Sequence, residues 1–254
     1  MIAALALAVA VGGTPPRIVI ASDSTAANYG PSQYPQMGWG MVLKCSLDPR
    51  IQVVNLARGG RSTKTFIEEG LWDQLVAQLQ PGDTVLIQFG HNDADTKKIV
   101  RFTDPNGAYD VNLRRFVADV RAKQGVPVLV TPIARWLWEN GAPKDAHTAY
   151  AAAIHRVATD LKVPLVDLDS DMMAALKARG QLASRGLYMQ YQPYDGVARF
   201  PEGIRDDTHI NEQGARLGAA LVATRLAKLK LPLSRFVHPA PLDNQARLGG
   251  PSCP

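Results

Sequence analysis

The chain has 254 residues, of which 46% are hydrophobic and 20% charged, and this balance suits one large α/β domain. Its formal net charge of +5 fits either an ordinary solvated surface or attraction to anionic substrates such as uronic-acid polysaccharides. The sequence has no lysine- or arginine-rich run and no aromatic-basic stripe, which argues against a nucleic-acid-binding protein.

Residues 1–16 are a candidate signal segment. Residues 1–12 are all small or apolar, and this stretch is too short to span a bilayer. Ala8-Val9-Ala10 resembles the small-residue cleavage site of a secretory signal, although the usual preceding lysine or arginine is missing. An N-terminal strand or buried arm is the alternative. We therefore expect a secreted or periplasmic protein that does not act on a membrane.

Short apolar runs alternate with helical patterns along the rest of the chain. Strands are predicted at residues 17–21, 51–55, 84–89, 127–131 and 165–167. Helices are predicted at residues 37–48, 64–79, 110–123, 145–162 and 212–229, the last with Asn211 as a reasonable N-cap. Residues 181–208 are rich in Gly, Pro and Tyr and are expected to be irregular. This alternation predicts an α/β fold with a five-stranded parallel sheet covered on both faces.

The proline- and glycine-rich residues 231–254 are expected to form an extended C-terminal tail. The chain has two cysteines, Cys45 and Cys253, and their spacing fits neither a zinc site nor a redox motif. In an exported protein a disulfide between them would hold the tail. The sequence does not give their distance, so this pairing stays open.

Residues suited to acyl transfer follow the first three predicted strands. Ser24 follows the first strand, Gly60 the second and Asn92 the third. Ligands of parallel sheets bind beyond the carboxyl ends of the strands, so we expect these residues to lie together. Ser24 is the candidate nucleophile, with Ser22 and Thr25 as rival hydroxyls and a simple N-cap role as the alternative.

Gly60 and Asn92 are candidates for the oxyanion hole. A glycine lets the backbone approach a ligand closely, and a side-chain amide can donate a hydrogen bond to a developing oxyanion. A tight-turn glycine and an asparagine that caps a turn are the alternative interpretations.

An Asp-x-x-His pattern near the end of the chain supplies a candidate base. His209 would accept the serine proton, and Asp206 would orient the imidazole, with Asp207 as a competing carboxylate. A metal site is the other interpretation of such a pattern, and His91, Asp93 and Asp95 form a second acidic-histidine cluster. Neither set forms a closed group of ligands, so we expect no metal and no other cofactor.

Three further residues are candidates for substrate binding. Trp136 and Trp138 follow the fourth predicted strand, on the expected side of the active site, where indole rings can stack on sugars. His147 either reaches the cleft or only begins the following helix.

The four blocks together resemble the SGNH (GDSL-type) hydrolase family across most of residues 17–230. The Asp and Ser of the family's Gly-Asp-Ser motif match Asp23 and Ser24, while Ser22 replaces the glycine. The block-two glycine matches Gly60, Gly-x-Asn-Asp matches Gly90-His91-Asn92-Asp93, and Asp-x-x-His matches Asp206 and His209. This resemblance implies a flavodoxin-like three-layer α/β/α fold, no metal and a Ser-His-Asp mechanism.

Within that family the chain most resembles the rhamnogalacturonan acetylesterase branch. The stretches that carry this resemblance are Asp23-Ser24-Thr25, Gly38-Trp39-Gly40, Gly60-Arg61-Ser62, Phe89–Asp93, Thr131–Arg135 with His147 and Tyr150, and Asp206–His209. It implies a carbohydrate O-acetylesterase whose partner is an acetylated pectic polysaccharide or oligosaccharide. The alternatives are another short-chain ester, lipid or thioester hydrolase of the same fold, or a non-catalytic carbohydrate-binding protein.

Overall fold

A computed structural model describes residues 16–242 and 247–254. The candidate signal segment, residues 1–16, therefore lies outside the described residues except for Pro16. Among the helices that the structure describes, none is both long and apolar enough to cross a membrane.

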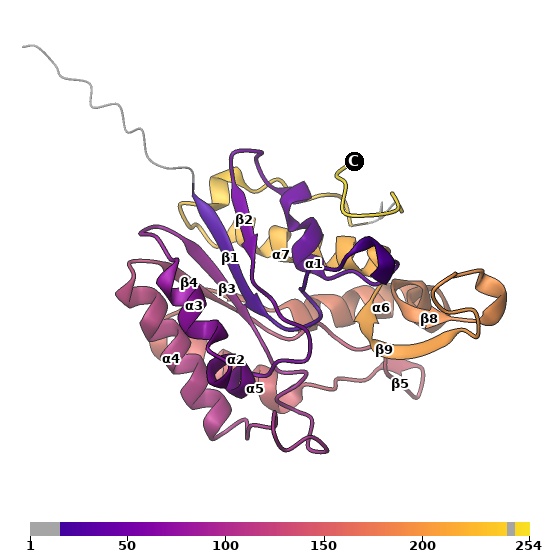
Figure 1. The fold of residues 1–254 in the computed structure, drawn as a ribbon, viewed down its shortest axis with the longest axis horizontal. Coiled ribbons are helices and arrows are strands. Elements are labelled where there is room, and N and C mark those ends of the chain that lie inside the picture. The colour runs from indigo at the N-terminus through magenta and orange to yellow at the C-terminus, as the bar shows by residue number, and fades with distance from the viewer. Residues whose placement is uncertain (1–15, 243–246) are drawn as a thin grey trace, which may run out of the picture.

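A five-stranded parallel sheet forms the centre of the molecule, as the sequence predicted (Figure 1). Its strands lie in the order β2-β1-β3-β4-β7, which is the flavodoxin-like order. The bounds are β1 (Arg17–Ser22), β2 (Gln52–Asn55), β3 (Thr84–Gln88), β4 (Val126–Val130) and β7 (Leu165–Val166). Strands β1, β3 and β4 are largely apolar because both of their faces are buried.

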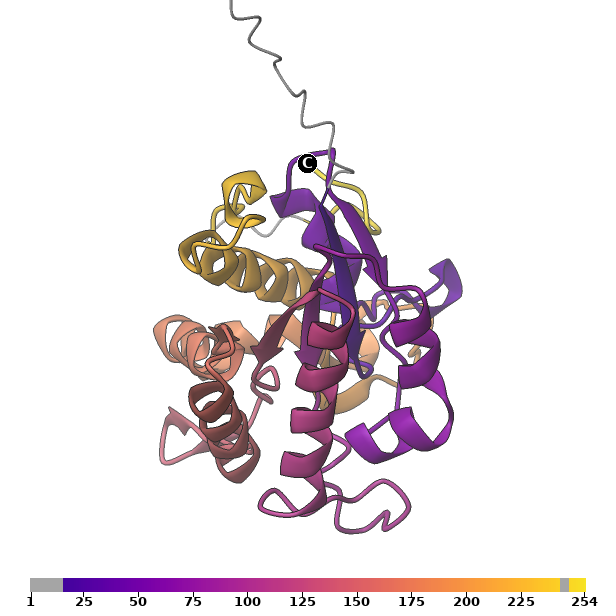
Figure 2. The ribbon, with the colours of Figure 1, turned by 90° about the vertical axis from the view of Figure 1, so that its left-hand side faces the viewer.

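Helices cover both faces of this sheet, so the predicted three-layer sandwich is confirmed (Figures 1 and 2). Side chains alternate along each strand: Ile18 and Ile20 face one helical layer, and Val19 and Ala21 face the other. The first layer holds α1 (Trp39–Val42), α6 (Leu168–Ser184) and α7 (Glu212–Lys228). The second holds α2 (Thr63–Glu68), α3 (Leu71–Ala77), α4 (Ala108–Ala122) and α5 (Thr148–Leu161).

Several predicted helices differ in detail. The predicted helix 37–48 consists of the short α1 and a 3-10 turn, η2 (Leu43–Ser46). The predicted helix 64–79 is divided into α2 and α3 by Gly70, whose φ of 71° is left-handed. Helix α6 was not predicted at all, although its buried Leu168, Met172 and Leu176 recur at the helical spacing of four.

The prediction that residues 181–208 are irregular was correct only for residues 192–203, which hold no more than a short 3-10 turn. This region contains β8 (Tyr188–Tyr191) and most of β9 (Ile204–Ile210), which pair antiparallel. Short 3-10 turns flank β8: η3 (Arg185–Leu187) and η4 (Pro193–Asp195). A further small hairpin, β5 (Trp138–Glu139) and β6 (Ala142–Pro143), follows β4. The remaining 3-10 turns are η1 (Pro31–Gln33) and η5 (Ser234–Phe236).

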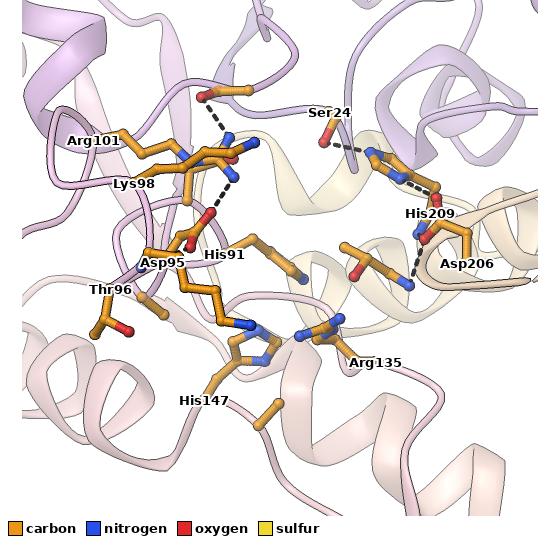
Figure 3. Close-up of a pocket in the computed structure, with 16 residues that line it drawn as sticks. Ser24, His91, Asp95, Thr96, Lys98, Arg101, Arg135, His147, Asp206 and His209 are labelled. Carbon is orange, nitrogen blue, oxygen red and sulfur yellow. Dashed lines mark hydrogen bonds and ion pairs between the residues drawn. The ribbon is translucent and has the colours of Figure 1, made fainter.

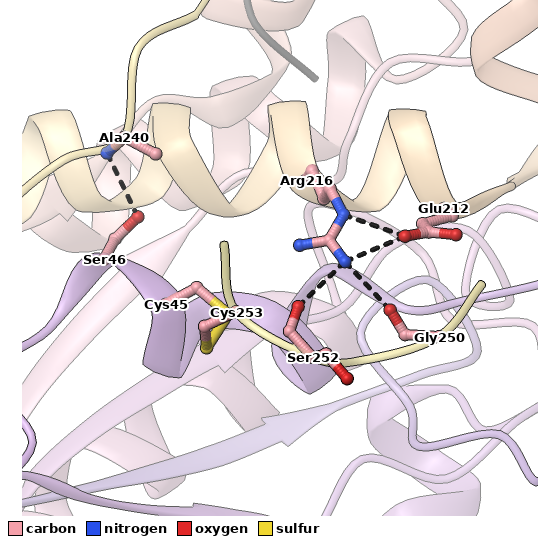
Figure 4. The surroundings of a disulfide bond; sticks show 8 residues. All are labelled: Cys45, Ser46, Glu212, Arg216, Ala240, Gly250, Ser252 and Cys253. Carbon is pink, nitrogen blue, oxygen red and sulfur yellow. Dashed lines mark hydrogen bonds and ion pairs between the residues drawn. A yellow bond between two sulfur atoms is a disulfide. The ribbon is translucent and has the colours of Figure 1, made fainter. Parts of the chain in front are cut away.

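The C-terminal residues pack back onto the first helical layer (Figure 4). Cys253 forms a disulfide with Cys45 in η2, which settles the pairing that the sequence left open. Arg216 of α7 donates hydrogen bonds to the carbonyls of Gly250 and Ser252, at 2.8 and 2.9 Å. Its guanidinium also pairs with the buried carboxylate of Glu212.

Candidate active site

A polar cavity of about 660 Å³ opens at the carboxyl ends of the central strands (Figure 3). Six of the residues predicted to act in catalysis or substrate binding line it: Ser24, Gly60, Asn92, His147, Asp206 and His209. The first four follow β1, β2, β3 and β4, as the position of ligand sites in parallel sheets predicts. The last two come from β9.

Strand β9 presents His209 through an irregularity in its pairing with β8. Met189 is opposite Asp206, whereas its neighbour Tyr188 is opposite Ile210, so residues 207–209 bulge out of the ladder. Such a bulge redirects the side chains that it contains. The bulge brings His209 to the turn that follows β1.

The serine, histidine and aspartate side chains form a continuous hydrogen-bonded chain (Figure 3). Ser24 Oγ lies 2.9 Å from His209 Nε2, and His209 Nδ1 lies 2.7 Å from Asp206 Oδ2. Asp206 Oδ1 also accepts the backbone N–H groups of Thr208 and His209. Burial opposes ionisation of Asp206, but the contacts with His209 outweigh it and hold the pKa of Asp206 below its usual value.

The alternative candidates for the nucleophile and for the orienting carboxylate bind residues other than His209. Ser22 and Thr25 are buried; the Ser22 hydroxyl donates to the side-chain oxygen of Gln88, and the Thr25 hydroxyl donates to Asp23 Oδ1 at 2.8 Å. Asp207 accepts a hydrogen bond from Gln190 rather than from the imidazole. The structure therefore places only Ser24 and Asp206, among these alternatives, in contact with His209.

Gly60 and Asn92 border the cavity beside Ser24. Gly60 has a φ of 79°, a left-handed conformation that suits glycine, and an added Cβ would approach Arg101. Asn92 Nδ2 donates one hydrogen bond to the Arg61 carbonyl at 2.9 Å, which fixes the amide. An amide nitrogen carries two hydrogens, so one remains for a ligand.

Asp93 joins the segment that carries Asn92 to neighbouring parts of the chain through hydrogen bonds. It is fully buried and accepts hydrogen bonds from the N–H and hydroxyl of Thr63 and from the hydroxyl of Thr103. Burial raises the pKa of Asp93 to about 6. Asp95 pairs instead with Arg101, so His91, Asp93 and Asp95 do not converge as metal ligands.

Buried ionisable side chains form the floor of the cavity. The rings of His91 and His147 meet edge to face, with their centroids 4.4 Å apart. Burial, together with the charges of His91 and Arg135, lowers the pKa of His147 well below its usual value, which favours a neutral imidazole. Asp169 Oδ1 lies 3.6 Å from His147 Nδ1, and burial with the neighbouring Asp145 and Asp167 raises the pKa of Asp169 to about 7.

Asp145, His147 and Asp169 also form the one group, among the residues that the structure describes, with metal-ligand atoms within 4.8 Å of one another. Both oxygens of Asp145 already accept hydrogen bonds, from the His147 N–H and the Thr148 hydroxyl. This group is not the cluster of His91, Asp93 and Asp95 that the sequence offered as an alternative metal site.

Trp136 and Trp138 do not line the cavity. Both are half-buried against the core beneath the first helical layer. The Trp136 indole N–H donates to Ser184 at the end of α6, at 3.1 Å. Because α6 was not predicted, a packing partner for this ring could not be foreseen.

Four cations that were not predicted as site residues also line the cavity: Lys97, Lys98, Arg101 and Arg135, the last of which ends the Thr131–Arg135 stretch named above for its resemblance. A usable signal existed for Arg135. It follows the fourth strand at the same edge of the sheet as Ser24, Gly60 and Asn92, where side chains can reach a ligand.

Known proteins resemble this chain over most of its length. Residues 23–217 match the model of the GDSL-like Lipase/Acylhydrolase family. The probable rhamnogalacturonan acetylesterase YesY of Bacillus subtilis is 37% identical over 220 residues, which cover 87% of this chain and 96% of that protein. The rhamnogalacturonan acetylesterase RhgT of the same organism is 36% identical over 220 residues, covering 86% and 93% of the two chains.

Solved structures share the fold. The crystal structure of protein YXIM from Bacillus subtilis superposes with a TM-score of 0.74 at 28% identity, covering 87% of this chain and 58% of that one. Axe2, an acetylxylan esterase from Geobacillus stearothermophilus, has a TM-score of 0.57 at 18% identity, covering 85% and 94%. At that identity the likeness concerns the fold alone.

Proposed function

The chain belongs to the GDSL-like lipase/acylhydrolase family, and on this premise we propose that it is a carbohydrate O-acetylesterase acting on pectic polysaccharide. The observation that carries the proposal is the 2.9 Å contact between Ser24 Oγ and His209 Nε2, with Asp206 on the other ring nitrogen. This arrangement has the geometry of a serine nucleophile with its base and orienting acid.

The proposed reaction proceeds in two steps. Ser24 Oγ attacks the acetyl carbonyl and gives its proton to His209 Nε2, while Asp206 stabilises the imidazolium. The N–H groups of Ser24 and Gly60 and the side chain of Asn92 donate hydrogen bonds to the oxyanion. His209 then protonates the departing sugar oxygen, and water, deprotonated by His209, releases acetate from the acetyl-serine.

The relatives support an acetylated sugar polymer as the substrate. Two of them carry the name rhamnogalacturonan acetylesterase, and each aligns over more than nine tenths of its own length. The cavity lining is mainly polar and cationic, whereas a lipid or thioester hydrolase would need an apolar groove for a long acyl chain.

We also propose that the protein acts outside the cytoplasm. The apolar residues 1–12 fit a secretory signal, and the disulfide between Cys45 and Cys253 fits an oxidising compartment. A polymeric substrate, which does not cross membranes, is in keeping with that location.

Acetate release from a panel of esters tests the proposed substrate. We expect the fastest release from acetylated pectic polymer, slower release from acetylated xylan, and little turnover of octanoyl or longer esters. With the pectic polymer, apparent affinity should fall as salt rises, because salt screens attraction between the acidic chain and the cationic cavity. A preference for octanoyl over acetyl esters would contradict the carbohydrate proposal.

A further inference from the structure

Arg135 is a cation at the cavity that has no anionic partner in the part of the chain that the structure describes. Its side chain lines the cavity together with Ser24 and His209, and its Nε atom is buried without a hydrogen bond (Figure 3). Within residues 16–242 and 247–254, no carboxylate forms an ion pair with it. A buried guanidinium nitrogen without a partner is costly, so a ligand that supplies a carboxylate would be stabilised beside this half-buried side chain.

The backbone around Arg135 is anchored on both sides. The preceding carbonyl, that of Ala134, accepts a hydrogen bond of 2.7 Å from the Tyr188 hydroxyl of β8. The following N–H, that of Trp136, donates to the Asp207 carbonyl at 2.8 Å. Because Asp207 adjoins Asp206, the backbone at Arg135 is fixed relative to the Ser-His-Asp chain, and only the side chain has to be ordered on binding.

The charges around the cavity favour an anion. Four lining side chains are cationic, Lys97, Lys98, Arg101 and Arg135, and two are carboxylates, Asp95 and Asp206. Both carboxylates are already engaged, Asp95 with Arg101 and Asp206 with His209. Lys97 and Lys98 are exposed and form no ion pair with another described residue. The free positive charge therefore lies on the two lysines and on Arg135.

The immediate neighbours of Arg135 do not neutralise it. His147 beside it favours the neutral form, and its Nδ1 has no hydrogen-bond partner. Asp169 lies beyond His147 and makes its close contact with the imidazole rather than with the guanidinium. An anion that enters from the cavity would thus meet Arg135 without competition from a bound carboxylate.

We propose that Arg135 forms a subsite that binds a uronic-acid carboxylate of the polymer while an acetyl ester of the same chain occupies Ser24. This inference rests on the proposed function. The guanidinium group offers a planar fork of N–H donors that matches the two carboxylate oxygens. Lys98, on the far side of the cavity in Figure 3, gives additional long-range attraction. Arg135 thereby selects acidic over neutral acetylated chains.

The test compares two substrates that differ only at the carboxylates: an acetylated oligogalacturonide and the same material after methyl esterification. The measured quantity is the ratio of kcat/KM for the acid to that for the methyl ester. Charge-assisted hydrogen bonds of this kind typically change affinity about 10- to 100-fold. We expect a ratio in that range for the natural chain, a ratio near one for Arg135→Gln, and an intermediate ratio for Arg135→Lys.

Arg121→Gln is the matched control. Arg121 is exposed in the last turn of α4, outside the cavity, and its side chain donates, among the described residues, only to the Leu161 carbonyl. This variant removes the same charge and should retain both the activity and the ratio of the natural chain. A ratio in Arg135→Gln equal to that of Arg121→Gln would overturn the subsite, as would an equal loss on both substrates.

A binding measurement separates this inference from the proposed function. If the natural chain released no acetate from either substrate or from acetylated pectic polymer, the proposed function would fail. Calorimetric titration with an unacetylated oligogalacturonide then decides the subsite by itself. Binding that weakens at least about 10-fold in Arg135→Gln supports it, and equal binding by both proteins overturns it.

Discussion

Replacement of Asp206 by asparagine should abolish most of the activity without unfolding the protein. In the natural chain Oδ1 accepts two backbone N–H groups, each at 2.9 Å, and Oδ2 accepts His209 Nδ1 at 2.7 Å. Asparagine keeps one oxygen, which can retain the two backbone contacts. Its nitrogen then faces His209 Nδ1 and favours the tautomer that carries its proton on Nε2. That tautomer donates to Ser24 and cannot accept its proton.

The expected loss in kcat reaches about 10⁴-fold, the size of this tautomer effect in well-studied triads, or about 5.5 kcal/mol of transition-state stabilisation. Asp207→Asn is the matched control, because its side chain can keep accepting from Gln190 and should cost less than about threefold. Initial rates with a small acetyl ester, together with circular dichroism to verify folding, give the comparison. Equal losses in the two variants, or a larger loss in Asp207→Asn, would refute the assignment of Asp206.

Three further predictions address the nucleophile, metals and pH. Ser24→Ala should reduce acetyl-ester turnover to background in a folded protein, while Ser22→Ala should not; near-normal turnover in the first variant would move the nucleophile elsewhere. Activity should survive exhaustive chelation; loss that a divalent ion restores would instead assign a metal to the group around His147 and Asp169. Because the pKa of Asp169 is raised to about 7 from an ordinary 3.8, its contribution to stability is complete below 3.8 and is lost as pH rises through about 7. One pH unit corresponds to about 1.4 kcal/mol, so the free energy of unfolding of Asp169→Asn, relative to that of the natural chain, should rise by up to roughly 4 kcal/mol between pH 4 and 8. Denaturant unfolding at both pH values measures this difference. A difference that does not change with pH would contradict the titration of Asp169 as its cause.

The parts of the site that depend on local sequence could be predicted. Ser24, Gly60 and Asn92 each follow a short apolar strand, and parallel strands bring such residues to one edge of the sheet. The Asn211 N-cap was likewise predictable, and its side chain accepts the N–H groups of Gln213 and Gly214.

The parts that depend on non-local pairing could not be predicted. The Asp-x-x-His spacing favoured Asp206 over Asp207, but the physical cause of that choice is the bulge in β9, which exists only because β8 pairs with β9. The sequence shows neither strand clearly, since this hairpin lies outside the alternating α/β pattern. The packing of Trp136 could not be predicted for the same reason, because its hydrogen-bond partner lies in α6, a helix that was not predicted.

The fastening of the C-terminal tail has a practical consequence for producing and modifying the protein. The Cys45–Cys253 bridge spans 208 residues, and a loop of that length stabilises the fold by about 5 kcal/mol on a chain-entropy estimate. Expression in a reducing cytoplasm would remove this contribution. The tail N–H groups of Leu248 and Gly249 also donate to the carboxylate of Glu212, three residues after His209. We therefore expect that loosening the tail would disturb the backbone that carries His209. An affinity tag is therefore better fused ahead of Arg17, at the amino end of β1, than after Pro254, next to the bridge.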